Sequence, residues 1–67
     1  MNLENITNTR IRETIAEYIH SQKVRDILLD RYVNGYTYER IAELHDMSTV
    51  QIKRIVYKNE LNIFNHL

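Results

Sequence analysis

A chain of 67 residues makes one domain, and without cysteine it has neither a disulfide nor a thiolate zinc site to stabilise it. Its nine basic and nine acidic residues cancel, which argues against attraction of nucleic acid by net charge alone. No apolar run approaches the roughly 20 residues of a membrane span, and the N-terminus has no signal-peptide core. We therefore expect a cytoplasmic protein that does not enter the membrane.

The first predicted helix spans about residues 8–20. Apolar side chains recur along it at every fourth position and give one buried stripe, made of Ile11, Ile15 and Ile19. Asparagine and threonine are good N-cap residues, so we expect Asn8 or Thr9 to begin this helix.

The second predicted helix spans about residues 22–34, with Ser21 as its N-cap. Its apolar face consists of Val24, Ile27, Leu28 and Tyr32. The helix is expected to end at Asn34 and Gly35, because glycine readily adopts the left-handed conformation that closes a helix. We therefore expect Gly35 to have a positive φ.

Two shorter helices follow. The first is expected over residues 38–45, after the N-cap Thr37. The second is expected over about residues 49–59, and Ser48 and Gln51 form a Ser-x-x-Gln capping box at its start. The expected buried side chains are Ile41, Ala42 and Leu44 in the first of these helices, and Ile52, Ile55 and Val56 in the second.

Residues 37–58 have the pattern of a helix-turn-helix. The small side chain of Ala42 lets the second helix cross closely over the first, and Met47 fills the turn. Asp46 stands where this turn commonly holds glycine, and aspartate tolerates the left-handed region better than most residues. Strand signals are absent. The predicted fold class is therefore all-α, a compact bundle of four to five short helices that contains a helix-turn-helix and forms a single domain over residues 1–67.

Residues 23–58, with the sequence KVRDILLDRYVNGYTYERIAELHDMSTVQIKRIVYK, resemble the promoter-reading region four of bacterial sigma factors. The residues that carry the resemblance are Gly35, Thr37, Ile41, Ala42, Met47, Ser48, Ile52 and Ile55. LuxR-type response regulators and the DNA-binding domains of serine recombinases share much of this pattern. The resemblance implies sequence-specific binding of double-stranded DNA and regulation of transcription. A complete sigma factor needs further regions, so we expect a free-standing regulator of the kind that bacteriophages and mobile elements carry.

The helix predicted at about residues 49–59 fits the major groove, where base edges present distinguishable donors, acceptors and methyl groups. Its segment from Thr49 to Lys58 contains three basic residues and no acidic one. The residues expected to read bases are Thr49, Val50, Lys53 and Arg54. The residues expected to contact the DNA backbone are Tyr57 and Lys58, together with Thr37, Tyr38 and Arg40, whose positions resemble those that brace the backbone in this class. The alternative for each of them is a solvated surface side chain.

No residue pattern supports catalysis. The three histidines, His20, His45 and His66, fall at no metal-binding spacing, so we expect no enzymatic activity, no metal and no cofactor. The competing hypothesis for function is a protein-binding module that acts on RNA polymerase or on another regulator. The balanced net charge favours this hypothesis, and the basic segment within residues 49–58 opposes it.

A homodimer is expected, because one domain offers only about four to six phosphate contacts, and two copies on half-sites one helical turn apart bind more tightly. The tail over residues 60–67 contains four apolar side chains, Leu61, Ile63, Phe64 and Leu67. We expect this tail to form a short separate helix at the dimer interface. The first helix is the rival interface, and packing of the tail within one monomer is the alternative.

Overall fold

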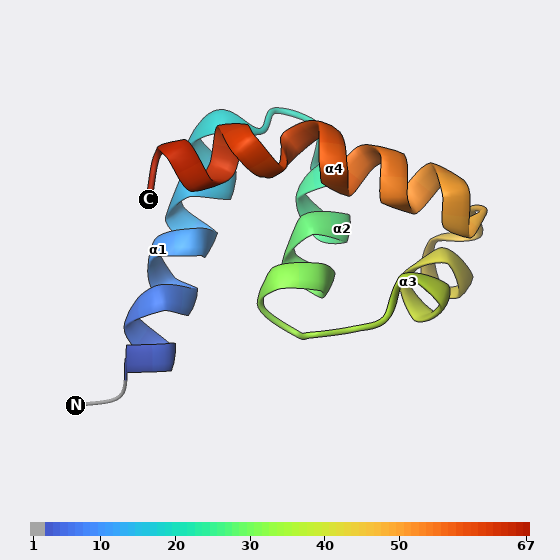
Figure 1. Ribbon diagram of the computed structural model, residues 1–67, viewed down its shortest axis with the longest axis horizontal. Helices are drawn as coiled ribbons and strands as arrows, with labels where there is room; N and C mark the ends of the chain where they lie inside the picture. Colours follow the sequence, from blue (N-terminus) through green and yellow to red (C-terminus); the bar gives the residue numbers. More distant parts are fainter. Residues whose placement is uncertain (1–2) are drawn as a thin grey trace.

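The computed structural model describes the backbone of residues 3–67 and the side chains of residues 8–67. This part of the chain consists of four α-helices with no strand: α1 (Leu3–Tyr18), α2 (Gln22–Tyr32), α3 (Tyr38–His45) and α4 (Thr49–Asn65) (Figure 1). The prediction of a small all-α bundle is therefore confirmed.

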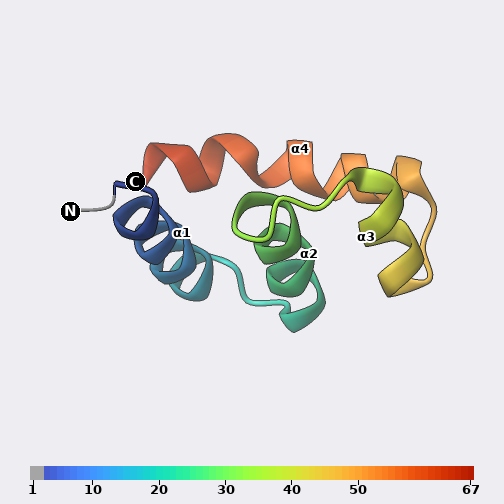
Figure 2. The same ribbon diagram turned by 90° about the horizontal axis from the view of Figure 1, so that it is seen from below.

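The longest helix, α4, runs along the long axis of a molecule that measures 36 × 22 × 17 Å. The other three helices lie in a row along one side of α4, in both views of the ribbon (Figures 1 and 2). Each of them contacts α4, and α2 lies between α1 and α3. The opposite side of α4 is consequently open to solvent.

The predicted N-caps of the last three helices are confirmed, because Ser21, Thr37 and Ser48 each have an extended backbone and accept a hydrogen bond from the helix that follows. At Ser48 the capping box is complete. The backbone N–H of Gln51 donates to the Ser48 hydroxyl at 3.1 Å. In return, the backbone N–H of Ser48 donates to the side-chain oxygen of Gln51 at 3.0 Å. These bonds fix where α4 begins, and they occupy the Gln51 side chain.

The core is a single cluster of apolar side chains from all four helices. Its buried members are Ile11, Ile15, Ile19, Ile27, Leu28, Ile41, Ala42, Ile52, Val56 and Ile63. The predicted stripes of the first two helices are thus confirmed, and Ile55 packs partly buried against the same cluster.

The prediction that Leu44 is buried is wrong, because its side chain is 53% exposed. Leu44 lines a surface hollow together with residues of α2 and with Arg12 of α1. In the same hollow the neighbouring His45 pairs with Asp30 of α2, its Nε2 lying 2.9 Å from a carboxylate oxygen. The hollow is open to solvent, so the Leu44 side chain remains exposed although it faces α2.

Two predicted helix ends are also wrong. The first helix begins at Leu3, so neither Asn8 nor Thr9 is its N-cap. The last helix does not stop near Asn59, because α4 continues without a break to Asn65. Burial of Ile63 in the common core stabilises this extension more than the asparagines of the tail weaken it.

The last turn of α4 is also attached to α1. The rings of Tyr18 and His66 stack with their centroids 3.9 Å apart, and the Arg10 guanidinium donates to the Leu67 carbonyl at 3.1 Å. The alternative in which the tail packs within one monomer is thus confirmed for Ile63. Ile11, Ile15 and Ile19, the residues proposed for the rival interface on the first helix, are buried in the core of the single chain.

None of the helices within residues 3–67 combines the length and the apolar character that a membrane crossing requires.

Candidate nucleic-acid interface

The two helices predicted to form the reading unit, α3 and α4, are joined by a turn of three residues, Asp46, Met47 and Ser48. Asp46 ends α3 in the left-handed conformation with φ 54°, as predicted. The Met47 amide donates to the Ala42 carbonyl at 2.9 Å, and this bond closes the turn. Ala42 is buried, and α3 runs across the direction of α4 (Figure 2). The predicted local geometry of residues 37–58 is therefore present.

The outer face of α4 follows from the helix period of about 100° per residue. Val50 and Arg54 are four residues apart and share the side opposite Ile52, and the Val50 side chain is 64% exposed. Lys53 and Arg54 are adjacent, so they point about 100° apart and cannot both project from the middle of this face. Val50 and Arg54 thus lie at the centre of the exposed face, and Lys53 lies at one edge.

Thr49 is half-buried, because it lies three residues before Ile52 and seven before Val56, on the inner side of α4. It is therefore less accessible than Val50 to a partner that lies across the outer face.

Aromatic and basic side chains meet at one edge of the outer face of α4. Tyr38, at the start of α3, contacts Tyr57 with ring centroids 6.0 Å apart. The Lys53 ammonium lies 5.7 Å from the centre of the Tyr38 ring, and the Arg31 guanidinium lies 4.2 Å from it. Burial raises the pKa of the Tyr38 hydroxyl, Tyr57 adds to the rise, and Arg31 opposes it. Three helices thus contribute to one cluster.

A second aromatic and basic pair lies next to it, where the chain enters α3. The Arg40 guanidinium lies 5.5 Å from the centre of the Tyr36 ring, and Arg40 is exposed. The Thr37 hydroxyl accepts a hydrogen bond from the Arg40 amide at 3.1 Å, so its own proton remains available to donate. Thr37 and Arg40 thus meet at the start of α3, whereas the Tyr38 ring contacts Tyr57 and Arg31 and not Arg40.

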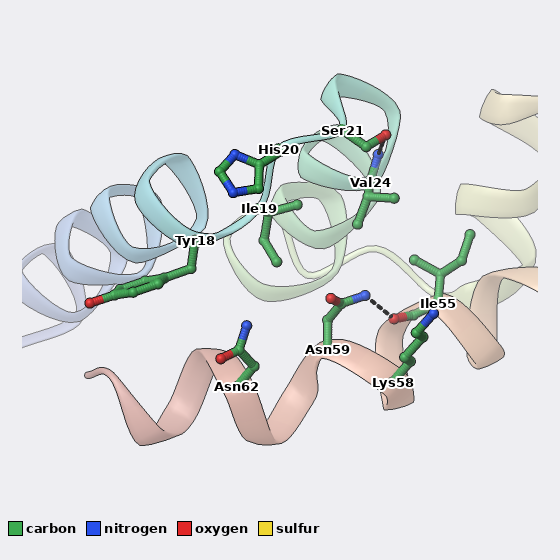
Figure 3. A pocket seen from close by; sticks show the side chains of 9 residues that line it. All are labelled: Tyr18, Ile19, His20, Ser21, Val24, Ile55, Lys58, Asn59 and Asn62. Carbon is green, nitrogen blue, oxygen red and sulfur yellow. Dashed lines mark hydrogen bonds between the residues drawn. The ribbon is translucent and has the colours of Figure 1, made fainter.

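Lys58 lies on the other side of α4 from Tyr57. It borders a hollow of about 300 Å³ between α4 and the corner that joins α1 to α2 (Figure 3). The Asn59 side chain lies in the same hollow and donates to the Ile55 carbonyl at 2.8 Å. The predicted backbone-contacting residues are thus divided between the two edges of α4. This division suits a helix in a groove, because the major groove is bordered by a phosphate backbone on each side.

The corner between α2 and α3 holds this cluster in place. Asp30 accepts hydrogen bonds at both carboxylate oxygens, from Asn34 at 3.0 Å and from the His45 ring at 2.9 Å. Gly35 has φ +72°, which confirms the predicted positive value, and the Tyr36 amide donates to the Asp30 carbonyl at 3.0 Å. The corner therefore fixes where Tyr36 and Tyr38 emerge.

Arg31 was not among the predicted site residues. It belongs to α2, outside the 37–58 motif, and the periodicity of α2 does not indicate that its side chain reaches Tyr38. The one available signal is its charge near the start of the motif. The Arg31 Nη1 donates a hydrogen bond to the Tyr36 carbonyl at 3.0 Å, and this bond holds the guanidinium over the Tyr38 ring.

Comparison of the chain with protein-family models, with curated proteins and with solved structures found no match. Within the part of the chain that the structure describes, no group of three or more His, Asp or Glu side chains is arranged to hold a metal ion. Any function must therefore be inferred from the arrangement of the chain's own residues.

Proposed function

We propose that this protein binds double-stranded DNA in a sequence-specific manner and regulates transcription, with the outer face of α4 in the major groove. The observation that carries the proposal is the acid-free segment Thr49–Lys58, which lies at the capped start of a helix whose outer side is open to solvent. The resemblance of residues 23–58 to region four of sigma factors supports the same function. Such a protein acts in the cytoplasm, where bacterial DNA lies.

In this proposal the central residues of the face read the bases. Arg54 donates two hydrogen bonds to O6 and N7 of a guanine, and Val50 contacts the methyl group of a thymine. Phosphates on either side of the groove are bound by the edge residues, Tyr38 and Arg40 on one side and Lys58 on the other. Base contacts provide sequence preference, and phosphate contacts provide affinity that depends on salt.

The test starts from a pool of random duplexes selected on the immobilised protein, followed by titration of the selected duplex and a scrambled one by fluorescence anisotropy. Arg54→Ala is expected to cost about 1–3 kcal/mol on the selected duplex and to relax preference at one base pair. Lys58→Ala is expected to weaken both duplexes equally and to lower the salt slope by about one.

The matched control is Arg12→Ala, because Arg12 is exposed and borders a hollow that contains no residue of α4. This variant is expected to bind like the wild type. The proposal fails if the wild type selects no duplex at low salt, or if Arg54→Ala retains both affinity and sequence preference.

The second candidate function is a protein-binding module that acts on RNA polymerase or on another regulator. One observation favours it: the outer face of α4 continues beyond Lys58 with the exposed apolar side chains of Leu61 and Phe64, 75% and 45% exposed. Co-purification of RNA polymerase with the wild type, lost with Leu61→Glu and retained with Arg54→Ala, supports this candidate. Retention of polymerase by both variants contradicts the use of this surface.

The same apolar pair supports the proposal of a homodimer. Leu61 and Phe64 lie on the last two turns of α4, so two copies can contact each other there while Val50 and Arg54 project beyond the contact. Light scattering at micromolar concentration is expected to give twice the chain mass, and Leu61→Glu is expected to give the monomer mass. Truncation after Asn59 is unsuitable as a test, because it also removes Ile63 from the core.

A further inference from the structure

The Tyr38 ring contacts two cations that come from two other helices. Arg31 reaches it from α2, with its guanidinium carbon 4.2 Å from the ring centre, and Lys53 reaches it from α4, with its ammonium 5.7 Å away. Each cation is attracted to the ring, but the two cations repel each other. Tyr57 contacts the ring as well and contributes no charge opposite to theirs.

Neither cation is neutralised by the protein. In the part of the chain that the structure describes, no carboxylate lies within salt-bridge distance of Arg31 or Lys53. Arg31 donates one hydrogen bond to the Tyr36 carbonyl, which fixes the guanidinium, and a guanidinium has five N–H donors in all. The cluster therefore holds two positive charges near one ring, with donors still available, which is the chemistry of an anion-binding site.

We propose that Arg31 and Lys53, both held against the Tyr38 ring, bind one phosphate of the DNA backbone. This inference rests on the proposed DNA-binding function and refines it, because it adds Arg31 to the interface. It also reassigns Lys53 from reading bases to contacting the backbone. The position of Lys53 supports the reassignment: it lies about 100° around α4 from Arg54, at the edge of the reading face.

A backbone phosphate suits this site better than a free anion. The site lies beside the reading face, so a duplex against Val50 and Arg54 passes next to it, with the border of the groove on the Tyr38 side. The planar guanidinium of Arg31 donates two parallel bonds to phosphate oxygens, and the Lys53 ammonium adds a point charge. Tyr38 acts as a positioning residue, because its ring holds both cations.

The test measures DNA affinity against salt concentration for Arg31→Gln, Lys53→Gln and the control Arg12→Gln, on the selected and the scrambled duplex. The two site variants are each expected to weaken both duplexes about tenfold, the effect of one hydrogen bond to a charged group. Each is expected to lower the salt slope by about 0.9 with the base preference unchanged. Tyr38→Phe keeps the ring and is expected to bind DNA more tightly than Tyr38→Leu, which is expected to weaken binding like Lys53→Gln. Thermal unfolding followed by circular dichroism establishes that each variant is folded under the assay conditions.

A changed base preference for Lys53→Gln, with the salt slope of the wild type, overturns the reassignment of Lys53. If Arg31→Gln and Lys53→Gln both keep the salt dependence of the wild type, the proposed phosphate site is wrong. A separate titration with inorganic phosphate, monitored by the Arg31 Nε–H and Lys53 side-chain NMR signals, distinguishes this inference from the proposed function. Saturable shifts of both signals in a protein that binds no duplex support an anion site and contradict DNA binding, and the absence of such shifts in that protein overturns both.

Discussion

Replacement of Ile63 by alanine tests whether the last turns of α4 belong to the monomer core. The Ile63 side chain has no exposed surface, and it joins the same apolar cluster as Ile15 and Val56. Removing a buried isoleucine side chain down to alanine costs about 2–5 kcal/mol, because both burial and packing contacts are lost. A domain of this size is stabilised by only about 5–10 kcal/mol, so the loss is a large fraction of the total.

The matched control lies two residues away on the same helix. Leu61 is 75% exposed, so Leu61→Ala is expected to change the free energy of unfolding of the monomer by no more than about 0.5 kcal/mol. The two variants are compared by urea and thermal unfolding, each followed by far-UV circular dichroism. Ile63→Ala is expected to lower Tm by at least about 8 °C, since each kcal/mol shifts a domain of this size by about 4–8 °C.

Measurements at two protein concentrations separate burial within the monomer from burial between copies. Ile63→Ala is expected to lower the free energy of unfolding by the same amount at both protein concentrations. A loss of stability that arises from dimerisation would depend on concentration. Equal stabilities of Ile63→Ala and Leu61→Ala at low concentration would refute the placement of Ile63 in the monomer core.

Three further predictions concern the ends of helices and one tyrosine. Gly35→Val is expected to destabilise the domain by about 1–2 kcal/mol in urea unfolding. An added Cβ meets no other part of the chain within 4 Å, so the cost is backbone strain at φ +72°, and Gly35→Asn is expected to cost less. Ser48→Ala removes the cap of α4 and is expected to cost about 1 kcal/mol, with Ser48→Thr close to the wild type in the same assay. Burial raises the pKa of Tyr32 above its ordinary value, and Glu60 adds to the rise, so the unfolded chain releases this proton first and stability falls as the pH rises above about 10. Tyr32→Phe is expected to lose less stability between neutral and alkaline pH than the wild type, and an identical loss contradicts the assignment.

The features predicted correctly from the sequence are those that depend on neighbouring residues. The caps at Ser21, Thr37 and Ser48 and the positive φ of Gly35 follow from local backbone chemistry, and the structure contains all four. The apolar stripes are also local, since a helix brings every third or fourth residue to one side. Such signals do not depend on where the other helices lie.

Several of the features predicted wrongly depend on contacts between distant residues. The exposure of Leu44 depends on how closely α1 and α2 approach α3, and the hollow between them leaves this side chain open to solvent. The length of α4 is decided by the core that covers Ile63, although the asparagines near it are weak helix formers. Likewise, the position of Lys53 at the Tyr38 ring cannot be derived from the spacing of residues on α4 alone. In each case the deciding partner lies on a different helix.

The balanced net charge is a weaker argument against DNA binding than it first appears from the sequence, because charges are screened beyond about 8 Å at physiological salt. Arg10 and Arg25 donate to backbone carbonyls at the ends of α4 and α1, so they stabilise helix ends.

By contrast, Arg31, Arg40 and Lys53 lie on the rings of Tyr36 and Tyr38, beside the outer face of α4. On α3, Glu39 and Glu43 each lie two residues from the buried Ile41, and therefore project from the opposite side of that helix. A phosphate beside Tyr38 interacts chiefly with charges inside this screening distance, and the Arg31 and Lys53 cations lie 4.2 Å and 5.7 Å from the ring centre. The affinity for DNA should accordingly depend on this local arrangement, and exchanging Arg12 or another distant charge should change it little.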